Sequence, residues 1–206
     1  MYRVLIVEDQ RIVQKILEET ISQSEEYKII GTIENAQNAI AFCLAGKIDL
    51  ILMDVCTAEG ESGIDAAKKI KRDFPNIKIV VITSMPEESF IRKAKEAKCD
   101  SFWYKDDSDG LLEVMDKTMK GANIYPEETP LLDIGYASSV NFTARELEVL
   151  RELVNGFSYR EVANELDIKE RTVKQHISNM LSKTGYKSTM QLVVDVVNKN
   201  LIIPGY

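Results

Sequence analysis

The sequence has few of the residues that build disulfides, zinc sites or membrane spans. Its three cysteines, Cys43, Cys56 and Cys99, are odd in number and follow no CxxC spacing, which indicates free thiols in a reducing compartment. Because His176 is the only histidine, a zinc site is not expected. No run approaches the roughly 18 apolar residues that cross a bilayer, and no signal peptide precedes the strand-like run that starts at Tyr2. These absences predict a cytoplasmic protein with no membrane partner.

The length of 206 residues favours two domains, and charge is divided unevenly along the chain. Residues 1–125 carry 17 basic and 22 acidic side chains. The stretch 169–187, by contrast, carries five basic side chains and one acidic side chain, Glu170. A basic element in an acidic chain points to a polyanionic partner, although a solvated helix face would carry the same charges.

Short apolar runs alternate with amphipathic patterns through the first 120 residues. The apolar runs predict strands at 2–7, 28–33, 49–54, 77–83 and 101–104. The amphipathic patterns predict helices near 10–24, 35–45, 63–73, 87–98 and 108–120. Strands that alternate with helices form a parallel sheet with helices on both faces. We therefore expect an α/β domain over residues 1–121.

The composition changes after residue 121. Residues 122–140 are acidic, contain Pro126 and Pro130, and show no sustained periodicity, which predicts an interdomain linker. Residues 141–206 are then helical in pattern, with four expected helices. The signals that start or stop these helices are the capping box Thr143–Glu146, Gly156, Ser158, Gly185 and Ser188.

Polar side chains follow four of the predicted strands at the point where each strand ends. They are Glu8 and Asp9, Asp54, Thr83 and Lys105. Because the carboxyl ends of parallel strands meet at one edge of a sheet, we expect these side chains to lie together. Carboxylates are ligands that Mg²⁺ prefers, and Asp54 could attack phosphorus to give an aspartyl phosphate. Lys105 and Thr83 would bind the phosphoryl oxygens.

Each of these residues has an ordinary explanation when it is taken alone. An aspartate at a strand end often caps the next helix, and a threonine there is often a turn residue. A single lysine is usually solvated. The occurrence of all four kinds at the ends of four different strands is what predicts a magnesium and phosphoryl site.

This order of residues resembles the receiver domain of two-component response regulators, over about residues 1–120. The resemblance implies a flavodoxin-like, doubly wound sheet of five parallel strands, in which Asp54 accepts a phosphoryl group from a sensor histidine kinase. The Mg²⁺ ligands that it implies are Glu8, Asp9, Asp54 and the backbone carbonyl of Cys56. It also implies that Thr83 and Phe102 form a switch pair, in which the hydroxyl turns to the phosphate and the ring swings inward.

The chain departs from the usual receiver pattern at three places. Receivers usually have a proline four residues after the acceptor and a glycine eight residues after it. Here these positions are Ala58 and Ser62, and Gly63 comes one residue later. The loop over residues 55–63 is therefore expected to be one residue longer. The usual glycine before the switch aromatic is replaced by Ser101.

The second half resembles the LuxR-type helix-turn-helix domains, over about residues 140–203. The matching stretches are Phe142–Leu150, Gly156–Ala163, Leu166–Ile168, Arg171–Ile177 and Lys183–Gly185. With a receiver ahead of it, the chain is similar to response regulators of the NarL/FixJ type. Such a domain presents one helix to the major groove of double-stranded DNA, and the stripe of apolar residues after Ser188 is expected to be either core or a homodimer contact.

The candidate recognition helix has an apolar face of Val173, Ile177 and Leu181, which leaves its other side chains free to reach DNA. The expected base contacts are Lys174, Gln175 and Ser178. The expected phosphate contacts are Arg171, Thr172 and Lys183. His176 is expected to pack or to donate to a phosphate rather than to take part in catalysis.

We therefore expect a DNA-binding response regulator that controls transcription. It is not expected to be an enzyme, beyond autocatalysed phosphoryl acceptance and slow self-dephosphorylation at Asp54. The alternative is a phosphorylation-independent DNA-binding regulator, which the altered loop after Asp54 favours. A third candidate, an aspartate-nucleophile phosphohydrolase, normally has a second aspartate two residues after the nucleophile, where this chain has Cys56.

Overall fold

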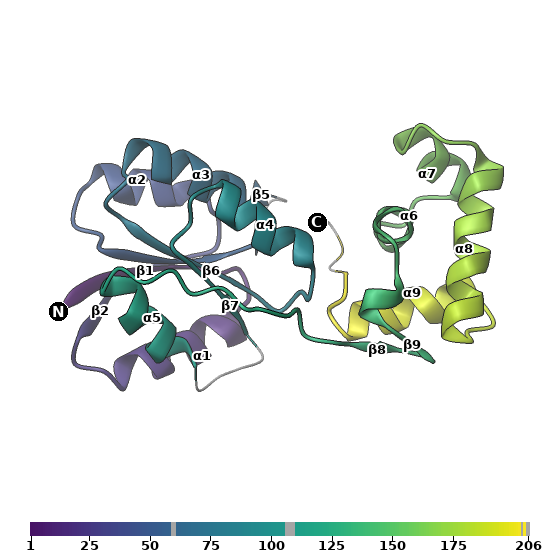
Figure 1. Cartoon of the computed structure of the whole chain (residues 1–206). Coiled ribbons are helices and arrows are strands. Elements are labelled where there is room, and N and C mark those ends of the chain that lie inside the picture. The colour runs from purple at the N-terminus through teal and green to yellow at the C-terminus, as the bar shows by residue number, and fades with distance from the viewer. Residues whose placement is uncertain (59–60, 106–109, 203, 205–206) are drawn as a thin grey trace. The chain divides into compact units, whose positions relative to one another are not determined.

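The computed structural model of the chain describes residues 1–58, 61–105, 110–202 and 204. Its contacts divide the chain into two compact units, Met1–Thr129 and Pro130–Tyr206 (Figure 1). Each unit has a hydrophobic core of its own. In the part of the chain that is described, no helix combines the length and the apolar character that a bilayer crossing needs.

The first unit is built on five parallel strands in the order β2-β1-β3-β6-β7. They are β1 (Tyr2–Val7), β2 (Tyr27–Ile33), β3 (Leu50–Asp54), β6 (Lys78–Thr83) and β7 (Ser101–Tyr104). The central strand β3 is buried along its whole length, as expected for an apolar strand that is covered on both faces. The strand order is that of flavodoxin-like sheets, so the predicted fold is confirmed.

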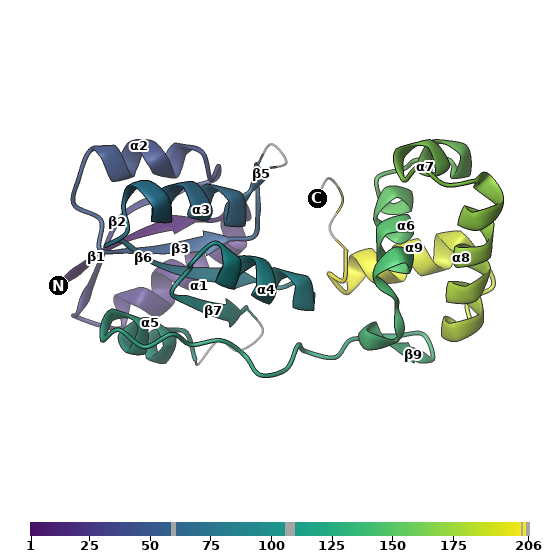
Figure 2. The same cartoon turned by 45° about the horizontal axis from the view of Figure 1, so that its top comes forward.

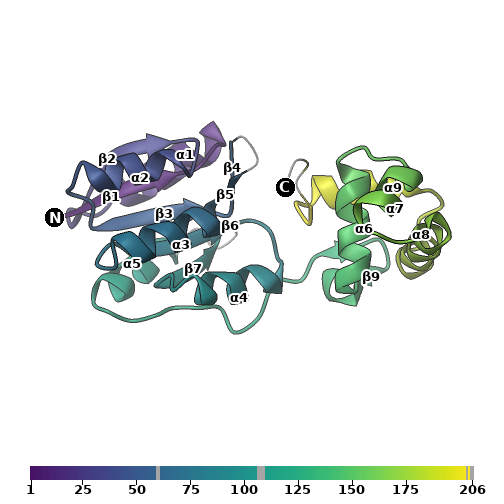
Figure 3. The same cartoon turned by 90° about the horizontal axis from the view of Figure 1, so that it is seen from above.

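Helices cover both faces of this sheet (Figures 1 and 2). One face carries α1 (Arg11–Ser22) and α5 (Leu111–Met119). The other carries α2 (Asn38–Leu44), α3 (Gly63–Asp73) and α4 (Glu88–Glu96), as the view from above also shows (Figure 3). The amphipathic patterns therefore predicted all five helices, and the expected start of the last one at residues 108–109 lies outside the described residues.

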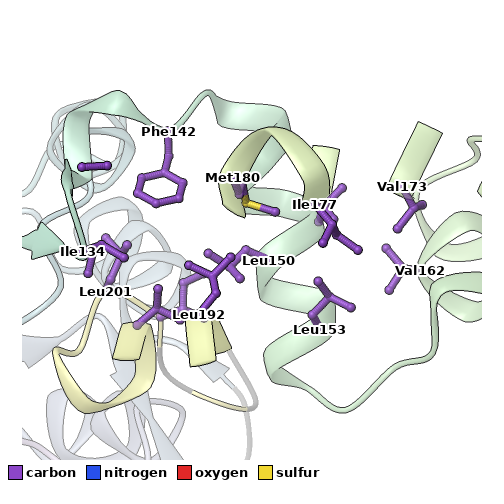
Figure 4. Close-up of a cluster of buried hydrophobic side chains, with 14 of the residues drawn as sticks. Ile134, Phe142, Leu150, Leu153, Val162, Val173, Ile177, Met180, Leu192 and Leu201 are labelled. Atoms are coloured by element: carbon purple, nitrogen blue, oxygen red, sulfur yellow. The ribbon is translucent and has the colours of Figure 1, made fainter. Parts of the chain in front are cut away.

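Among its described residues, the second unit contains four α-helices that pack around one core. They are α6 (Ala144–Val154), α7 (Tyr159–Glu165), α8 (Glu170–Thr184) and α9 (Thr189–Asn198). Capping boxes begin α6 at Thr143 and α7 at Ser158, because each hydroxyl accepts the N–H three residues later. Gly185 ends α8 in the left-handed conformation, with φ +76°. Figure 4 shows the apolar side chains that these helices direct into the core.

The second half of the stretch predicted as a linker has a defined structure. Strands β8 (Asp133–Ile134) and β9 (Ala137–Ser138) form an antiparallel hairpin, and a 3₁₀ turn follows over Ser139–Asn141. Ile134 is completely buried in the core of the second unit (Figure 4). Two-residue strands are too short to produce a hydrophobic period, so sequence patterns could not indicate them.

The buried stripe of α8 differs slightly from the predicted one. Val173 and Ile177 are buried as expected, but Met180 rather than Leu181 completes the stripe. Leu181 is only partly buried against the same core. Residues three apart lie on one face of a helix as closely as residues four apart do, so both positions fitted the pattern.

Candidate functional site

Three carboxylates converge at the carboxyl edge of the first sheet. Asp54 is the last residue of β3, and Glu8 and Asp9 directly follow β1, the neighbouring strand. One carboxylate oxygen of each residue lies within 4.8 Å of the others. Glu8 is 0% exposed and Asp54 is 3% exposed, whereas Asp9 is partly accessible. The sheet thus brings together the three acids that the sequence predicted to meet.

Lys105 places its ammonium group among these acids. The Lys105 Nζ lies 2.5 Å from Glu8 Oε2 and 3.0 Å from Asp54 Oδ1. The lysine directly follows β7, and its backbone N–H donates to the carbonyl of Thr83 at the end of β6 (2.9 Å). The register between β6 and β7 therefore fixes the position of Lys105 beside the acidic cluster.

The cluster gathers three carboxylates around the ammonium of Lys105. Burial raises the pKa of Asp54 to about 7; Lys105 opposes this shift and Glu8 adds to it. Burial also raises the pKa of Glu8. Burial alone would lower the pKa of Lys105, but the charges of Asp54 and Glu8 outweigh it, so that pKa is raised. An additional cation would relieve this repulsion, and carboxylate oxygens are the donors that Mg²⁺ takes.

The predicted switch residues lie on β6, which pairs with the strand of Asp54, and on β7, the next strand outward. Thr83 ends β6, is buried, and accepts the N–H of Met85 with its hydroxyl oxygen (3.1 Å). Phe102 lies in β7, the edge strand, and its ring is almost completely buried against Tyr104 in an edge-to-face contact at 5.1 Å. The ring is therefore already in an inward position in this structure.

The loop after Asp54 forms a short hairpin, β4 (Cys56–Thr57) with β5 (Glu61–Ser62). Cys56, whose carbonyl was predicted to bind the metal, begins β4, and its thiol contacts the sulfur of Met85 at 3.4 Å. Residues 59–60 of the loop that is predicted to be longer lie outside the described residues.

Gly63 closes this loop against Asp54. Its N–H donates to the carbonyl of Val55 (2.9 Å), and a Cβ added to it would lie 1.8 Å from the backbone oxygen of Asp54. No side chain fits at that distance. The close approach explains why a glycine is needed here.

The second candidate site is the exposed face of α8. Arg171, Lys174, Gln175 and Ser178 are exposed, and Thr172 and His176 are half-buried. The Gln175 amide donates to the Asn179 side chain (2.9 Å), and Lys174 pairs with Glu170 at 2.6 Å. Asn179, which sequence reasoning did not select, extends this face by one turn. Its spacing of four residues from Gln175 was the signal available.

Lys183 lies in a different environment from the other predicted DNA contacts. Its ammonium donates to Glu146 Oε2 (2.6 Å) and to the carbonyl of Asn141 (2.9 Å). Glu146 is buried and also accepts the N–H of Thr143 (2.8 Å). These contacts tie the last turn of α8 to the start of α6, so the ammonium is already engaged within the domain.

Two family models match the chain in the same order as the two units. Residues 4–116 match the response regulator receiver domain, and residues 140–196 match the bacterial regulatory proteins of the luxR family. The chain is 31% identical over 207 residues to the response regulator protein VraR of Staphylococcus aureus, covering 97% of this chain and 98% of that protein. The VraR protein of Staphylococcus epidermidis is 30% identical, again covering 97% of this chain and 98% of that protein.

Solved structures share the fold at lower identity. RcsB from Salmonella enterica serovar Typhimurium, bound to a promoter in the presence of a phosphomimetic, is 23% identical, with a TM-score of 0.56 over 94% of this chain and 96% of that chain. The response regulator ChrA of a heme-sensing two-component system is 22% identical, with a TM-score of 0.52 over 97% and 98%. The chain therefore belongs to the response regulators of the NarL/FixJ type, which join a receiver domain to a LuxR-type DNA-binding domain.

Proposed function

We propose that this response regulator controls transcription by accepting a phosphoryl group on Asp54 and binding double-stranded DNA with α8. The observation that carries the proposal is the convergence of Glu8, Asp54 and Lys105 at the end of the sheet. The donor would be the phosphohistidine of a sensor histidine kinase. Autocatalysed transfer and slow hydrolysis at Asp54 would be its only chemical steps.

The transfer uses the carboxylate of Asp54 as nucleophile. One oxygen of Asp54 forms a bond to phosphorus while the bond from phosphorus to the histidine nitrogen breaks, and the nitrogen keeps the electron pair. Lys105 can move from the carboxylates to the phosphoryl oxygens, since its ammonium already lies 3.0 Å from Asp54. The hydroxyl of Thr83 would donate to another of these oxygens.

Magnesium fits the donor set at this site. Glu8, Asp9, Asp54 and the backbone carbonyl of Cys56 would hold it, since three of these residues already gather carboxylate oxygens within 4.8 Å. A bound Mg²⁺ supplies positive charge that neutralises the phosphoryl oxygens. The nearly complete burial of Glu8 and Asp54 excludes water from the reacting carboxylate.

DNA binding is assigned to the exposed face of α8. In helix-turn-helix domains the N-terminal part of the recognition helix contacts base edges, and here that part presents Lys174, Gln175 and Ser178. Arg171 and Thr172 would contact phosphates. We place Lys183 in support of the helix rather than on the DNA, because its ammonium is shared by Glu146 and Asn141.

The partners and the compartment follow from the two domains. A homodimer would bind two half-sites about one helical turn apart, and the exposed side chains of Met190 and Val194 on α9 offer an apolar contact for it. The DNA partner and three free, buried cysteines fit a cytoplasmic location.

Intact-mass measurement tests the phosphoryl step. Incubation of the full chain with a small-molecule phosphodonor and Mg²⁺ should add one phosphoryl mass. Asp54→Asn should abolish the gain, and Asp65→Asn, an exposed aspartate at the start of α3, should retain it. Absence of the added mass on the wild-type chain with Mg²⁺ would overturn the proposal.

A second candidate is DNA binding that does not depend on phosphorylation. The inward position of Phe102 favours it, because a ring that is already buried needs no phosphate to draw it in. DNA affinity measured with and without beryllofluoride separates the two candidates. Equal affinities, together with a beryllofluoride-bound receiver, would support the second.

A further inference from the structure

The stretch between the two domains is attached to the edge strand of the receiver. The N–H of Phe102 in β7 donates to the carbonyl of Ile124 (2.8 Å), and the N–H of Ile124 donates to the Ser101 hydroxyl (3.0 Å). One residue later, the Tyr125 hydroxyl donates to the carbonyl of Cys99 (2.7 Å). The start of the stretch therefore lies along the open edge of β7, beside the predicted switch aromatic.

Ser101 supplies the side-chain acceptor of this attachment. It is completely buried, and its hydroxyl lies 2.6 Å from that of Thr118. Because Thr118 donates its own proton to the carbonyl of Val114 (2.6 Å), Ser101 donates to Thr118 and keeps a lone pair for the N–H of Ile124. A glycine at this position, the usual residue of receivers, would leave the Ile124 N–H without its acceptor.

The other end of the stretch is attached to the end of α8. The hairpin loop at Gly135 and Tyr136 meets the last residues of this helix, and the N–H of Tyr136 donates to the carbonyl of Thr184 (2.9 Å). A Cβ on Gly135, which has φ +61°, would lie 2.1 Å from the Thr184 oxygen. A Cβ on Gly185 would lie 2.4 Å from the Tyr136 ring. The loop and the helix end interlock through these two glycines.

The hairpin is held firmly against the rest of the second unit. Ile134, which Figure 4 shows, and Ala137 are buried in its core. Lys199 at the end of α9 donates to the carbonyl of Asp133 (2.5 Å). A displacement of the hairpin would therefore be transmitted to the helix end at Thr184.

Only the stretch 126–131 remains between these two attachments. It has six residues, two of which are Pro126 and Pro130. Proline fixes φ near −65° and favours extended backbone. A connection this short and stiff transmits a change at one end to the other, whereas a long flexible linker would absorb it.

We propose that residues 122–136 couple the switch strand β7 to the recognition helix α8, with Ser101 and Gly135 as the positioning residues at the two attachments. Phe102 is central to this coupling, since the residue that carries the switch ring also donates its N–H to Ile124. A change in β7 loosens or tightens the first attachment, and the hairpin passes it to Thr184. The part of this proposal that concerns signalling rests on the proposed phosphorylation of Asp54.

Hydrogen exchange on the full chain tests the coupling without any phosphoryl group. Ser101→Gly should raise exchange at Ile124, and also at Tyr136, whose amide lies in the other unit. Tyr125→Phe, a milder change at the same attachment, should act in the same direction. Tyr2→Phe, at the start of β1, is the matched control and should leave both amides unchanged. Faster exchange at Ile124 with no change at Tyr136 would overturn the proposal.

A DNA measurement with beryllofluoride tests the signalling part. The probe is a duplex selected from a random pool by the wild-type chain, and the fluorescence of Trp103, the only tryptophan, reports beryllofluoride binding. Ser101→Gly should still bind beryllofluoride, but the gain in DNA affinity that beryllofluoride produces should fall about twofold or more, because the first attachment loses the acceptor of the Ile124 N–H. An unchanged gain would overturn the proposal. The two parts of the proposal can fail separately. If beryllofluoride does not change the fluorescence of Trp103, but Ser101→Gly still raises hydrogen exchange at Tyr136, the coupling stands and the role of Asp54 fails.

The second attachment is tested in the same DNA assay. Gly135→Ala should weaken binding with and without beryllofluoride. Gly156→Ala is its control, because Gly156 also has a positive φ but nothing lies within 4 Å of its added Cβ. Tyr136→Ala, which keeps the backbone intact, repeats the test if Gly135→Ala does not fold. Wild-type affinity in both Gly135→Ala and Tyr136→Ala would contradict the role of the hairpin.

Discussion

The ammonium of Lys105 lies 3.0 Å from the carboxylate of Asp54, although 50 residues of chain separate them. The contact neutralises part of a buried charge that Glu8 and Asp9 would otherwise repel. Burial is the main cause of the raised pKa of Asp54; Lys105 opposes the shift, and the charge of Glu8 adds to it. The receiver therefore keeps, at its reactive edge, a local instability that a cation or the loss of one charge would relieve.

Asp54→Asn should stabilise the metal-free protein at neutral pH. The substitution removes one buried charge and keeps the shape of the side chain, so repulsion from Glu8 and Asp9 falls. We expect the free energy of unfolding of the receiver to rise by about 1–3 kcal/mol. Urea unfolding in EDTA, followed by Trp103 fluorescence, measures it. Lower stability of the variant would show that the contact with Lys105 outweighs the repulsion.

The stabilisation by Mg²⁺ should depend on pH. In the folded, metal-free protein, the pKa of Asp54 is raised to about 7, above its unfolded value, so this group lowers stability as the pH rises from about 4 to about 7. Mg²⁺ would compete with this proton for the carboxylate of Asp54. The increase in the melting temperature of the protein on adding Mg²⁺ should therefore grow as pH approaches 7 and then level off. Differential scanning fluorimetry between about pH 5.5 and 8.5 measures this gain, and a constant gain would contradict the assignment.

Gly63→Ala should disrupt the loop after Asp54. The added Cβ would lie 1.8 Å from the Asp54 backbone oxygen, and backbone cannot move aside as a flexible side chain can. We expect a loss of about 3 kcal/mol or more in the stability of the receiver, with weaker Mg²⁺ binding. Gly31→Ala is the matched control, since its added Cβ meets only side-chain atoms of Phe42 and Leu5 at 3.0 Å or more. Equal losses in the two variants would argue against a special role for Gly63.

The first domain could be predicted from the sequence because its signals are local. Each strand is a short apolar run with a polar residue at its end, and parallel strands bring their carboxyl ends to one edge. The convergence of Glu8, Asp54 and Lys105 followed from that rule alone. The role of Gly63 did not, since its closeness to Asp54 depends on the path of a hairpin that no period signals.

The second domain shows where sequence reasoning stops. Lys183 was expected on DNA because it is basic and follows the recognition helix pattern. Its contact with Glu146, 37 residues away, depends on how α6 packs on α8, which charge patterns do not reveal. The attachment of Tyr136 to Thr184 is hidden for the same reason. Composition gives the stretch 122–140 the character of a linker, whereas tertiary contacts order its second half.

The exposed face of α8 and Lys183 should respond differently to salt. Arg171→Ala removes a solvated charge that is expected to contact phosphate, so the slope of log affinity against log salt should become shallower by about 0.9. Lys183→Met should leave this slope unchanged, because the ammonium is already paired with Glu146. Fluorescence anisotropy over a salt series measures both slopes. A shallower slope for Lys183→Met would mean that Lys183 does contact a DNA phosphate.

Glu146→Gln should destabilise the second domain most clearly at neutral pH. Burial alone would raise the pKa of Glu146, but the hydrogen bonds from Lys183 and Thr143 lower it below its usual value. Its ion pair therefore stabilises the folded domain above the unfolded pKa and is lost as pH falls through the folded pKa.

We expect this variant to lose about 1–3 kcal/mol at pH 7, and less at low pH, because the glutamine amide oxygen can accept from Lys183 but carries no charge, so the ion pair is lost. Thermal unfolding by circular dichroism at several pH values measures the difference. Glu148→Gln is the control, since Glu148 pairs with Arg145 on the surface and should contribute under 1 kcal/mol. A loss for Glu146→Gln that does not shrink at low pH would mean that packing, and not the charge on the carboxylate, ties α6 to α8.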